Sequence, residues 1–179
     1  MAIKYAILGF LSWQALSGYD LKKLFEQAYF LYWSGNNNQI YTTLVQLHKD
    51  GAVTTEIDHQ TSGPSRKIYT ITDEGRQQLR EWLLAGPELP QLRQPFFLQL
   101  MWADTLSPVE LDELCAAYEH EMAIQLLMCQ EKARRNELDP ARSDRERLLW
   151  QLIAERWIGF YTEEVAWVQR LRAELAGKE

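Results

Sequence analysis

The hydrophobic period of the chain changes twice in its first half, and these changes restrict the possible folds more than any other feature. Apolar residues recur at helical spacing over residues 36–50. Two short runs with strand-like alternation follow, at residues 53–57 and 67–71, separated by a turn sequence that contains Gly63-Pro64. Residues 72–75 then open another helical stretch. The order helix, hairpin, helix predicts a winged helix, which presents a helix and a loop side by side.

Helical spacing also predicts two helices ahead of this unit, at residues 2–13 and 18–29. In the third helix, Ile40, Leu44 and Leu47 fall on one side and are expected to form its buried stripe. These positions leave the opposite side of the third helix for solvent or a partner.

Helix ends and caps complete the predicted first domain. Gly51 is expected to end the third helix, because glycine is the usual residue after a helix C-terminus. Thr72 is expected to cap the fourth helix, which should bury Leu79, Trp82 and Leu83. We therefore expect a winged helix domain over residues 1–85.

The rest of the chain predicts a second, purely helical domain. Three prolines mark residues 86–95 as a linker, and the helical domain is expected over residues 96–179. It should contain a short apolar helix and two long helices, each opened by a capping box, at Ser107 and Ser143. The fold class is thus mainly α, with a small β wing.

The final helix is apolar around much of its girth, and a single helical hairpin would leave many of these side chains in water. A second copy of the same chain is the simplest partner that could cover them. We therefore predict a homodimer joined by the helical domain. The expected interface residues are Phe97, Trp102, Trp150, Ile153, Trp157, Phe160, Tyr161 and Val168.

Charge is divided unevenly between the two predicted domains. Residues 1–85 hold eight basic and eight acidic residues, so the remaining 94 residues carry the whole net charge of −6. A nucleic acid responds to the local face that it meets and not to the total charge. The neutral first domain could therefore contact DNA, whereas the acidic second domain is not expected to.

Catalytic and metal-binding patterns are missing from the sequence. The three histidines lie in no metal-ligand spacing, and no phosphate loop or nucleophile motif is present. We expect no enzyme activity, no cofactor and no metal. The start of the chain lacks a signal-peptide layout and no apolar run could cross a bilayer, so a cytoplasmic protein without a membrane partner is expected.

Cys115 and Cys129 fall in one predicted helix, roughly 21 Å apart, which is too far for a disulfide. Two reduced, half-buried thiols are expected. The alternative is a redox sensor that pairs across a dimer.

The exposed side of the third helix is the first candidate for DNA contact. Amide and hydroxyl side chains can read base edges in the major groove. The plain alternative is an ordinary solvated helix face. The candidates on this helix are Asn37, Asn38, Tyr41, Thr42, Thr43 and Gln46, with Tyr41 at the edge of the face.

The turn of the predicted hairpin is the second candidate. Arg66 and Lys67 follow Ser65 at or beside the loop tip, where arginine can enter a minor groove and lysine can bind phosphate. Lys22 and Lys23 at the front of the second helix could clamp phosphate on the other side, or they could be ordinary surface residues.

Several motifs of the chain occur together in a recognisable order. They are Gly18-Tyr19-Asp20-Leu21, Ile40-Tyr41-Thr42-Thr43-Leu44-Val45-Gln46-Leu47, Gly51-Ala52-Val53, Arg66-Lys67-Ile68-Tyr69-Thr70-Ile71-Thr72 and, in the tail, Leu106-Ser107-Pro108-Val109-Glu110-Leu111. Together they resemble the PadR family of bacterial transcriptional regulators. The match covers residues 5–84, and the weaker similarity of the tail covers most of the remaining chain.

The resemblance implies a sequence-specific transcriptional regulator, usually a repressor, that binds an inverted-repeat operator as a homodimer. It also implies that Tyr41, Arg66 and Lys67 lie at the DNA. Two features depart from the family pattern: an asparagine run stands where proline is common, and Ser62 and Ser65 stand where basic residues are common.

Two further possibilities stay open. The overall acidity fits a winged helix that binds a protein and never DNA. A small-molecule effector of unknown identity could bind among Trp82, Phe96, Phe97, Trp102 and Trp157, although core and interface packing is the plainer interpretation of these aromatic residues.

Overall fold

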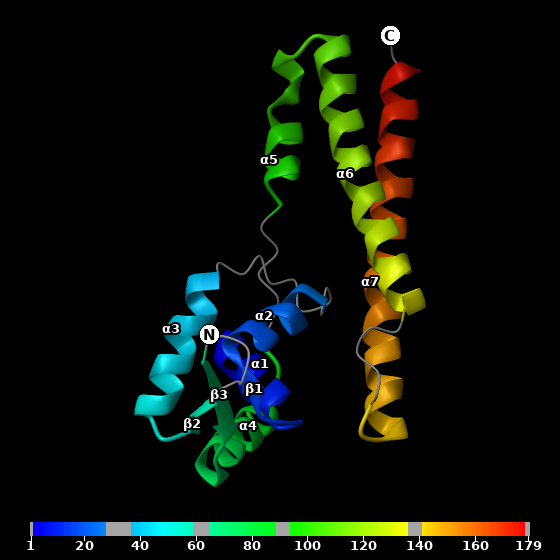
Figure 1. Ribbon diagram of the computed structural model, residues 1–179. Helices are drawn as coiled ribbons and strands as arrows, with labels where there is room; N and C mark the ends of the chain where they lie inside the picture. Colours follow the sequence, from blue (N-terminus) through cyan, green and yellow to red (C-terminus); the bar gives the residue numbers. More distant parts are fainter. Residues whose placement is uncertain (1, 28–36, 59–64, 89–93, 136–140, 178–179) are drawn as a thin grey trace. The chain divides into compact units, whose positions relative to one another are not determined.

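The computed structural model describes residues 2–27, 37–58, 65–88, 94–135 and 141–177 (Figure 1). The chain divides into two compact units, residues 1–89 and 90–179. Several predicted features lie outside the described residues, among them Asn36 at the start of the predicted third helix, the loop tip at residues 61–64 and residues 89–93 of the predicted linker.

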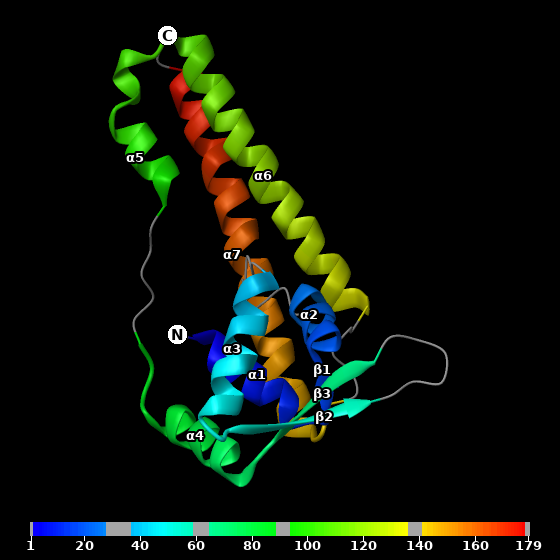
Figure 2. The same ribbon diagram turned by 60° about the vertical axis from the view of Figure 1, so that its left-hand side comes forward.

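In its described residues, the first unit combines four helices with a small antiparallel sheet in the order β1-β3-β2. Figure 2 shows the β2–β3 hairpin and α3 within this unit. Residue Val53 pairs with Ile71 and Asp58 with Arg66, so the two hairpin strands align over their full lengths. The elements are α1 (Ala2–Leu11), β1 (Leu16–Ser17), α2 (Gly18–Gln27), α3 (Asn37–Lys49), β2 (Val53–Asp58), β3 (Arg66–Ile71) and α4 (Asp73–Leu84).

Among the described elements of the first unit, strand β1 is the one that the sequence did not predict. Its two residues are too few to show an alternating pattern, and Leu16 pairs with Tyr69 of β3. Ser17 also caps α2, because its hydroxyl accepts a hydrogen bond from the Asp20 N–H (3.1 Å) while the Asp20 carboxylate accepts one from the Ser17 N–H (3.2 Å). The same short segment thus joins the sheet and starts a helix.

The core of the first unit is formed where α1, α2 and α3 meet. Ile40, Leu44 and Leu47 are at most 2% exposed, which confirms the predicted stripe of α3. Gly51 adopts a φ of 70°, a left-handed conformation that suits glycine, directly after the turn that ends α3. The Thr72 hydroxyl donates to the Gly51 carbonyl (2.7 Å) and accepts from the Gly75 N–H (3.1 Å), so the predicted cap of α4 also ties α4 to the end of α3.

The predicted burial on α4 is wrong for two of its three residues. Trp82 is 43% exposed and Leu83 is 67% exposed, and only Leu79 is half-buried. The Trp82 ring stacks on Tyr5 with a centroid distance of 4.6 Å, so one face of the indole is covered by α1. Amphipathic spacing located the correct side of α4 but overestimated how much of it the unit can cover.

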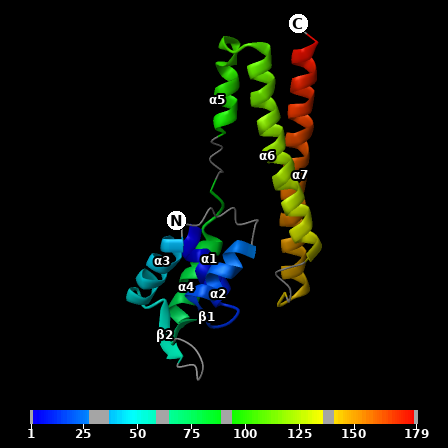
Figure 3. The same ribbon diagram turned by 45° about the horizontal axis from the view of Figure 1, so that its top comes forward.

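The second unit is a helical hairpin with a shorter helix beside it. It contains α5 (Pro95–Met101), the 3₁₀ turn η2 (Ala103–Thr105), α6 (Pro108–Arg135) and α7 (Asp144–Ala176). Helices α6 and α7 lie side by side in Figures 1 and 3.

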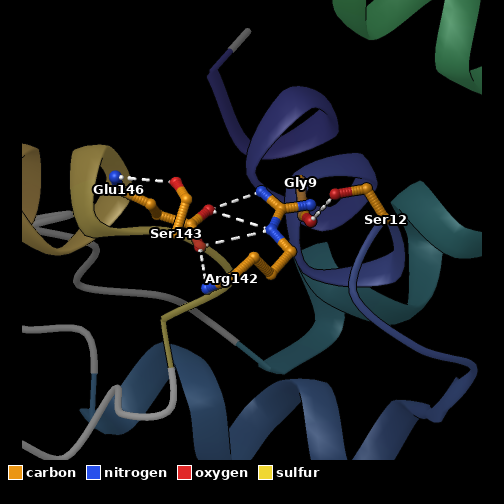
Figure 4. A network of polar contacts seen from close by, with 5 residues as sticks. All are labelled: Gly9, Ser12, Arg142, Ser143 and Glu146. Carbon is orange, nitrogen blue, oxygen red and sulfur yellow. Dashed lines mark hydrogen bonds and ion pairs between the residues drawn. The ribbon is translucent and has the colours of Figure 1, made fainter.

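The predicted capping box at Ser107 is confirmed, whereas at Ser143 the serine half of the box forms and the Glu146 carboxylate accepts from the N–H of Arg142 instead. The Ser107 hydroxyl accepts from the Glu110 N–H (3.4 Å), and the Glu110 carboxylate accepts from the Ser107 N–H (2.8 Å). At the start of α7, the Ser143 hydroxyl accepts from the Glu146 N–H (3.2 Å), as Figure 4 shows. The Glu146 carboxylate also accepts from the N–H of Arg142 (2.7 Å). Figure 4 separately draws Ser12, whose hydroxyl donates to the Gly9 carbonyl (2.6 Å) at the end of α1.

Phe96, Cys115 and Val168 form a buried apolar cluster in the core of the second unit. The Phe96 ring stacks on Tyr118 of α6, with centroids 3.8 Å apart, and meets Trp167 of α7 edge to face. Three elements therefore share one apolar cluster.

A polar cluster joins α6 and α7 beside this core. Arg172 of α7 forms ion pairs with Asp112 (2.8 Å) and Glu119 (2.6 Å) of α6. Its guanidinium lowers the pKa of Asp112, and hydrogen bonds from Gln169 and then Arg172 lower the pKa of Glu119. The carboxylates are therefore held in their charged form.

The two cysteines are free and buried, more deeply than predicted. Burial raises the pKa of the Cys115 thiol, and the nearby Asp112 carboxylate adds to the shift. Burial also raises the pKa of the Cys129 thiol. Because the thiolate is the reactive form, both environments favour unreactive thiols over a redox role.

Candidate nucleic-acid interface

One side of α3 is buried and the opposite side carries the predicted DNA-contacting residues. Asn38, Tyr41, Thr42 and Gln46 are exposed, and Thr43 is half-buried at the edge of this face. Asn37 begins the helix, and its side chain lies outside the described part of the structure. The polar face is continuous because positions three, four and seven apart share one side of an α-helix.

Val45 is a further candidate that the sequence analysis missed. It is 52% exposed and lies on the same face, about one turn after Thr42. An exposed apolar side chain on a groove-facing helix can contact the methyl group of thymine. The available signal was its spacing, since residue 45 is seven positions after Asn38 and four after Tyr41, on the side opposite the buried stripe.

Gln46 is oriented by a neighbouring acid. Its side-chain amide nitrogen donates to the Asp50 carboxylate over 2.7 Å. An ionised carboxylate only accepts hydrogen bonds, so the amide group must be the part of Gln46 that faces Asp50. The amide oxygen stays available to a DNA base as an acceptor for an amino group of adenine or cytosine, and the second N–H of the amide stays available as a donor.

Tyr41 connects α3 to the start of α2. One edge of its ring lies against Gly18, which is buried, while 45% of the residue surface is exposed. Burial raises the pKa of Tyr69 in β3, and the proximity of Tyr41 adds to that shift. The ring therefore both fills the space between the two helices and reaches the surface.

The basic residues of the hairpin lie at the start of β3 and not within the loop. Arg66 and Lys67 are the first two residues of the strand, and Ser65 precedes them; all three are exposed. In the ladder, Arg66 faces Asp58 and Lys67 faces Ile57. An acidic residue therefore lies opposite one of the two charges.

The two lysines of α2 differ in their contacts. The Lys22 ammonium pairs with Glu26 at 3.6 Å, whereas the Lys23 ammonium lies 4.7 Å from the centre of the Tyr19 ring. A lysine held over an aromatic ring keeps its charge unneutralised. Lys23 is thus better suited than Lys22 to bind phosphate.

Within the described ranges, no group of three or more histidine, cysteine or acidic residues could hold a metal ion. Of the helices that the structure describes, none is long and apolar enough to span a bilayer.

Comparisons with known proteins cover both units. The family model described as "Transcriptional regulator PadR-like family" matches residues 7–81, and the model "Virulence activator alpha C-term" matches residues 92–176. The negative transcriptional regulator PadR of Bacillus subtilis is 35% identical over 113 residues, which is 63% of this chain and 62% of that relative's length. The chain thus spans less than two thirds of that relative.

Solved structures match over nearly the whole chain. Bacillus subtilis PadR in complex with operator DNA is similar with a TM-score of 0.85 and 27% identity, covering 98% of this chain and 99% of the other. The same regulator in complex with p-coumaric acid gives a TM-score of 0.79 and 26% identity over the same shares. These matches include the winged helix and the long C-terminal helices, so the predicted mainly helical fold class is confirmed. By the two family models and these relatives, the chain belongs to the PadR-like family of transcriptional regulators.

Proposed function

We propose that the protein is a sequence-specific DNA-binding repressor of transcription that binds an inverted-repeat operator as a homodimer. The observation that carries the proposal is the division of α3 into a buried stripe and an exposed face that holds Asn38, Thr42 and Gln46. The hairpin of the same unit presents Arg66 and Lys67. A relative of the same fold that is crystallised on operator DNA supports this use of the unit.

The proposed roles follow from the chemistry of the side chains. Residues of the exposed α3 face enter the major groove, where the Gln46 acceptor and the Val45 methyl groups read base edges. Arg66 and Lys67 lie along the flanking backbone or minor groove, and Lys23 binds phosphate. Phosphate contacts fix the register of the protein on the duplex, and the α3 face supplies the sequence preference.

The proposed dimer rests on exposed apolar side chains of the second unit. The first half of α7 carries four exposed residues in two adjacent rows, Leu148, Leu149, Leu152 and Ile153, each between 42% and 53% exposed. A contiguous exposed apolar stripe usually marks an interaction site, where a partner covers it. A second copy with the same stripe would cover both.

The predicted interface residues divide into two groups on this basis. Phe97, Trp102 and Ile153 are exposed, and Trp150, Trp157 and Phe160 are half-buried, so these six stay candidates for the interface. Tyr161 and Val168 are 2% and 0% exposed and have almost no surface left for a partner. We assign both residues to the stabilisation of the single protomer, because Val168 packs in the core with Phe96 and Cys115.

A small-molecule effector is a separate candidate. Its support is a similar regulator in complex with p-coumaric acid. Of the aromatic residues considered for an effector site, Phe96 is buried in the core of the second unit and Trp82 stacks on Tyr5 in the first. Thermal unfolding with and without p-coumaric acid tests a phenolic effector, and an unchanged midpoint at saturating ligand would count against it.

Selection of bound fragments from the source genome tests the DNA-binding proposal. We expect enrichment of one inverted repeat whose half-sites lie about one helical turn apart, because two recognition helices of a dimer enter successive major grooves. A library that shows no enrichment after selection would contradict the proposal. Sedimentation of the free protein as a monomer would contradict the dimer.

A further inference from the structure

We propose that Gly18 is a positioning residue for DNA binding: because it has no side chain, the Tyr41 ring can lie against the start of α2 with its hydroxyl available to a DNA phosphate. The inference rests on the proposed DNA-binding function. It adds a residue that does not itself reach the DNA, since Gly18 is buried.

The space at Gly18 is occupied by Tyr41. A Cβ atom on Gly18 would lie 2.5 Å from Cε1 of the Tyr41 ring, 3.2 Å from Cδ1 and 3.3 Å from Cζ. Carbon atoms in contact ordinarily lie about 3.5–4.0 Å apart. Any larger residue at position 18 therefore requires the ring to move.

Backbone conformation does not explain the glycine. Gly18 has no left-handed φ, in contrast to Gly51, whose φ is 70°. It is the first residue of α2, a helix whose start is already capped by Ser17 and Asp20. Since most other residues favour a helix more than glycine does, a glycine here lowers helix stability, and the space taken by the Tyr41 ring explains why a glycine stands at this position.

The Tyr41 ring is bordered by more than one buried residue. Tyr69, which is 7% exposed, lies near enough for Tyr41 to affect its pKa. Tyr69 pairs with Leu16 in the sheet, two residues before Gly18. The ring therefore sits where α2, α3 and the sheet meet, and its orientation is set by the folded unit and not by α3 alone.

Gly75 provides a matched comparison because it fails the same steric test for a different reason. A Cβ atom there would collide with the backbone carbonyl oxygen of Ala52 and would lie 2.9 Å from Cγ1 of Ile71. Backbone cannot rotate aside, whereas the half-exposed Tyr41 ring can swing toward solvent. Alanine at position 75 should therefore cost stability, and alanine at position 18 should instead displace the ring.

The experiment is a double-mutant cycle on DNA bound by the wild-type protein. Gly18→Ala, Tyr41→Ala and the double variant are compared by thermal unfolding and by affinity for the selected operator and for a random duplex, with Gly75→Ala as the control. We expect Gly18→Ala to keep the wild-type unfolding midpoint and to weaken binding to both duplexes by roughly a hundredfold, the loss of one hydrogen bond to a charged group in each of the two protomers. Tyr41→Ala should lose as much, and the double variant no more than Tyr41→Ala.

Two results would overturn the inference. The first is wild-type affinity of Gly18→Ala together with weakened binding of Tyr41→Ala, and the second is losses that simply add in the double variant. If Gly18→Ala lowers the unfolding midpoint, the same cycle is evaluated on stability. In the Tyr41→Ala background, Gly18→Ala should then cause no further loss of the midpoint. A loss that persists in that background contradicts the steric account. A wild-type protein that binds no DNA defeats the proposed function instead, and the stability cycle still tests whether Gly18 and Tyr41 share this space.

Discussion

Replacing Arg66 and Lys67 with alanine is expected to weaken binding on every DNA sequence and to flatten its salt dependence. Both side chains are exposed at the start of β3. Each phosphate that a cation neutralises on duplex DNA contributes about 0.9 to the slope of log affinity against log salt. Two cations in each of two proposed protomers make four, so the slope should fall by up to about 3.6.

This slope corresponds to a large and measurable effect. Between 50 and 200 mM salt, a slope change of about 3.6 alters the ratio of the two affinities by roughly two orders of magnitude. Asp58 faces Arg66 across the hairpin and offsets part of that charge, so a somewhat smaller change is expected from Arg66→Ala alone. Gel-shift titrations at four salt concentrations, on the selected operator and on a random duplex, measure the slope directly.

Arg76→Ala with Arg80→Ala is the matched control, because it removes the same charge from exposed positions on α4, outside the proposed interface. Its slope should stay close to that of the wild type. The reasoning is refuted if the two double variants flatten the slope equally, or if neither changes it. Equal flattening would show that the net charge of the unit matters and that the position of the hairpin does not.

Three further outcomes are expected. Ile153→Glu should shift the protein toward monomer in sedimentation, because a charge would enter the apolar stripe of α7. The control Gln151→Glu should not cause this shift. If the Ile153→Glu dimer is as stable as the wild-type dimer, the stripe is not part of the interface. Asp50→Ala should broaden the base preference at one position of each half-site in sequence selection, because it releases Gln46 to present either end of its amide; an unchanged profile would show that the contact has no part in specificity. Arg172→Met should lower the free energy of unfolding modestly at pH 7 and by less at pH 2. Its two carboxylate partners have lowered pKa values, so their stabilisation is present near neutrality and is lost as the pH falls through those values; an equal loss at both pH values in denaturant titrations would contradict this.

Hydrophobic period and capping residues predicted most of the fold, because both act over a single turn or strand. The stripe of Ile40 and Leu44 and the caps at Thr72 and Ser143 depend only on residues a few positions away. Strand β1 could not be predicted in this way. It consists of two residues that become a strand only because β3 lies beside them.

Burial on α4 and α7 shows where local patterns fail. An apolar residue such as Leu83 indicates a side of a helix, but the area that the rest of the unit can cover is a tertiary quantity. Similarly, the sequence could not separate Val168, which belongs to the core, from Ile153, which is exposed on the same helix. Both are apolar residues in one long amphipathic pattern.

The sequence predicted which residues of the candidate site are exposed on α3, and the structure added the contacts that these residues make. The exposed positions of α3 followed from the opposite stripe, and Val45 could have been included by the same spacing. The contact of Tyr41 with Gly18 and that of Gln46 with Asp50 required coordinates, because neither a ring position nor an amide orientation can be derived from spacing alone.

The affinity for the selected inverted repeat, relative to a scrambled duplex of the same composition and at the same salt concentration, tests the central claim most directly. A protein that reads bases through the α3 face should prefer the inverted repeat by about a thousandfold or more at near-physiological salt. That preference should fall toward unity when Thr42 and Gln46 are both replaced with alanine. Equal affinity of the wild-type protein for both duplexes would contradict sequence-specific DNA binding and would favour a winged helix that binds another protein.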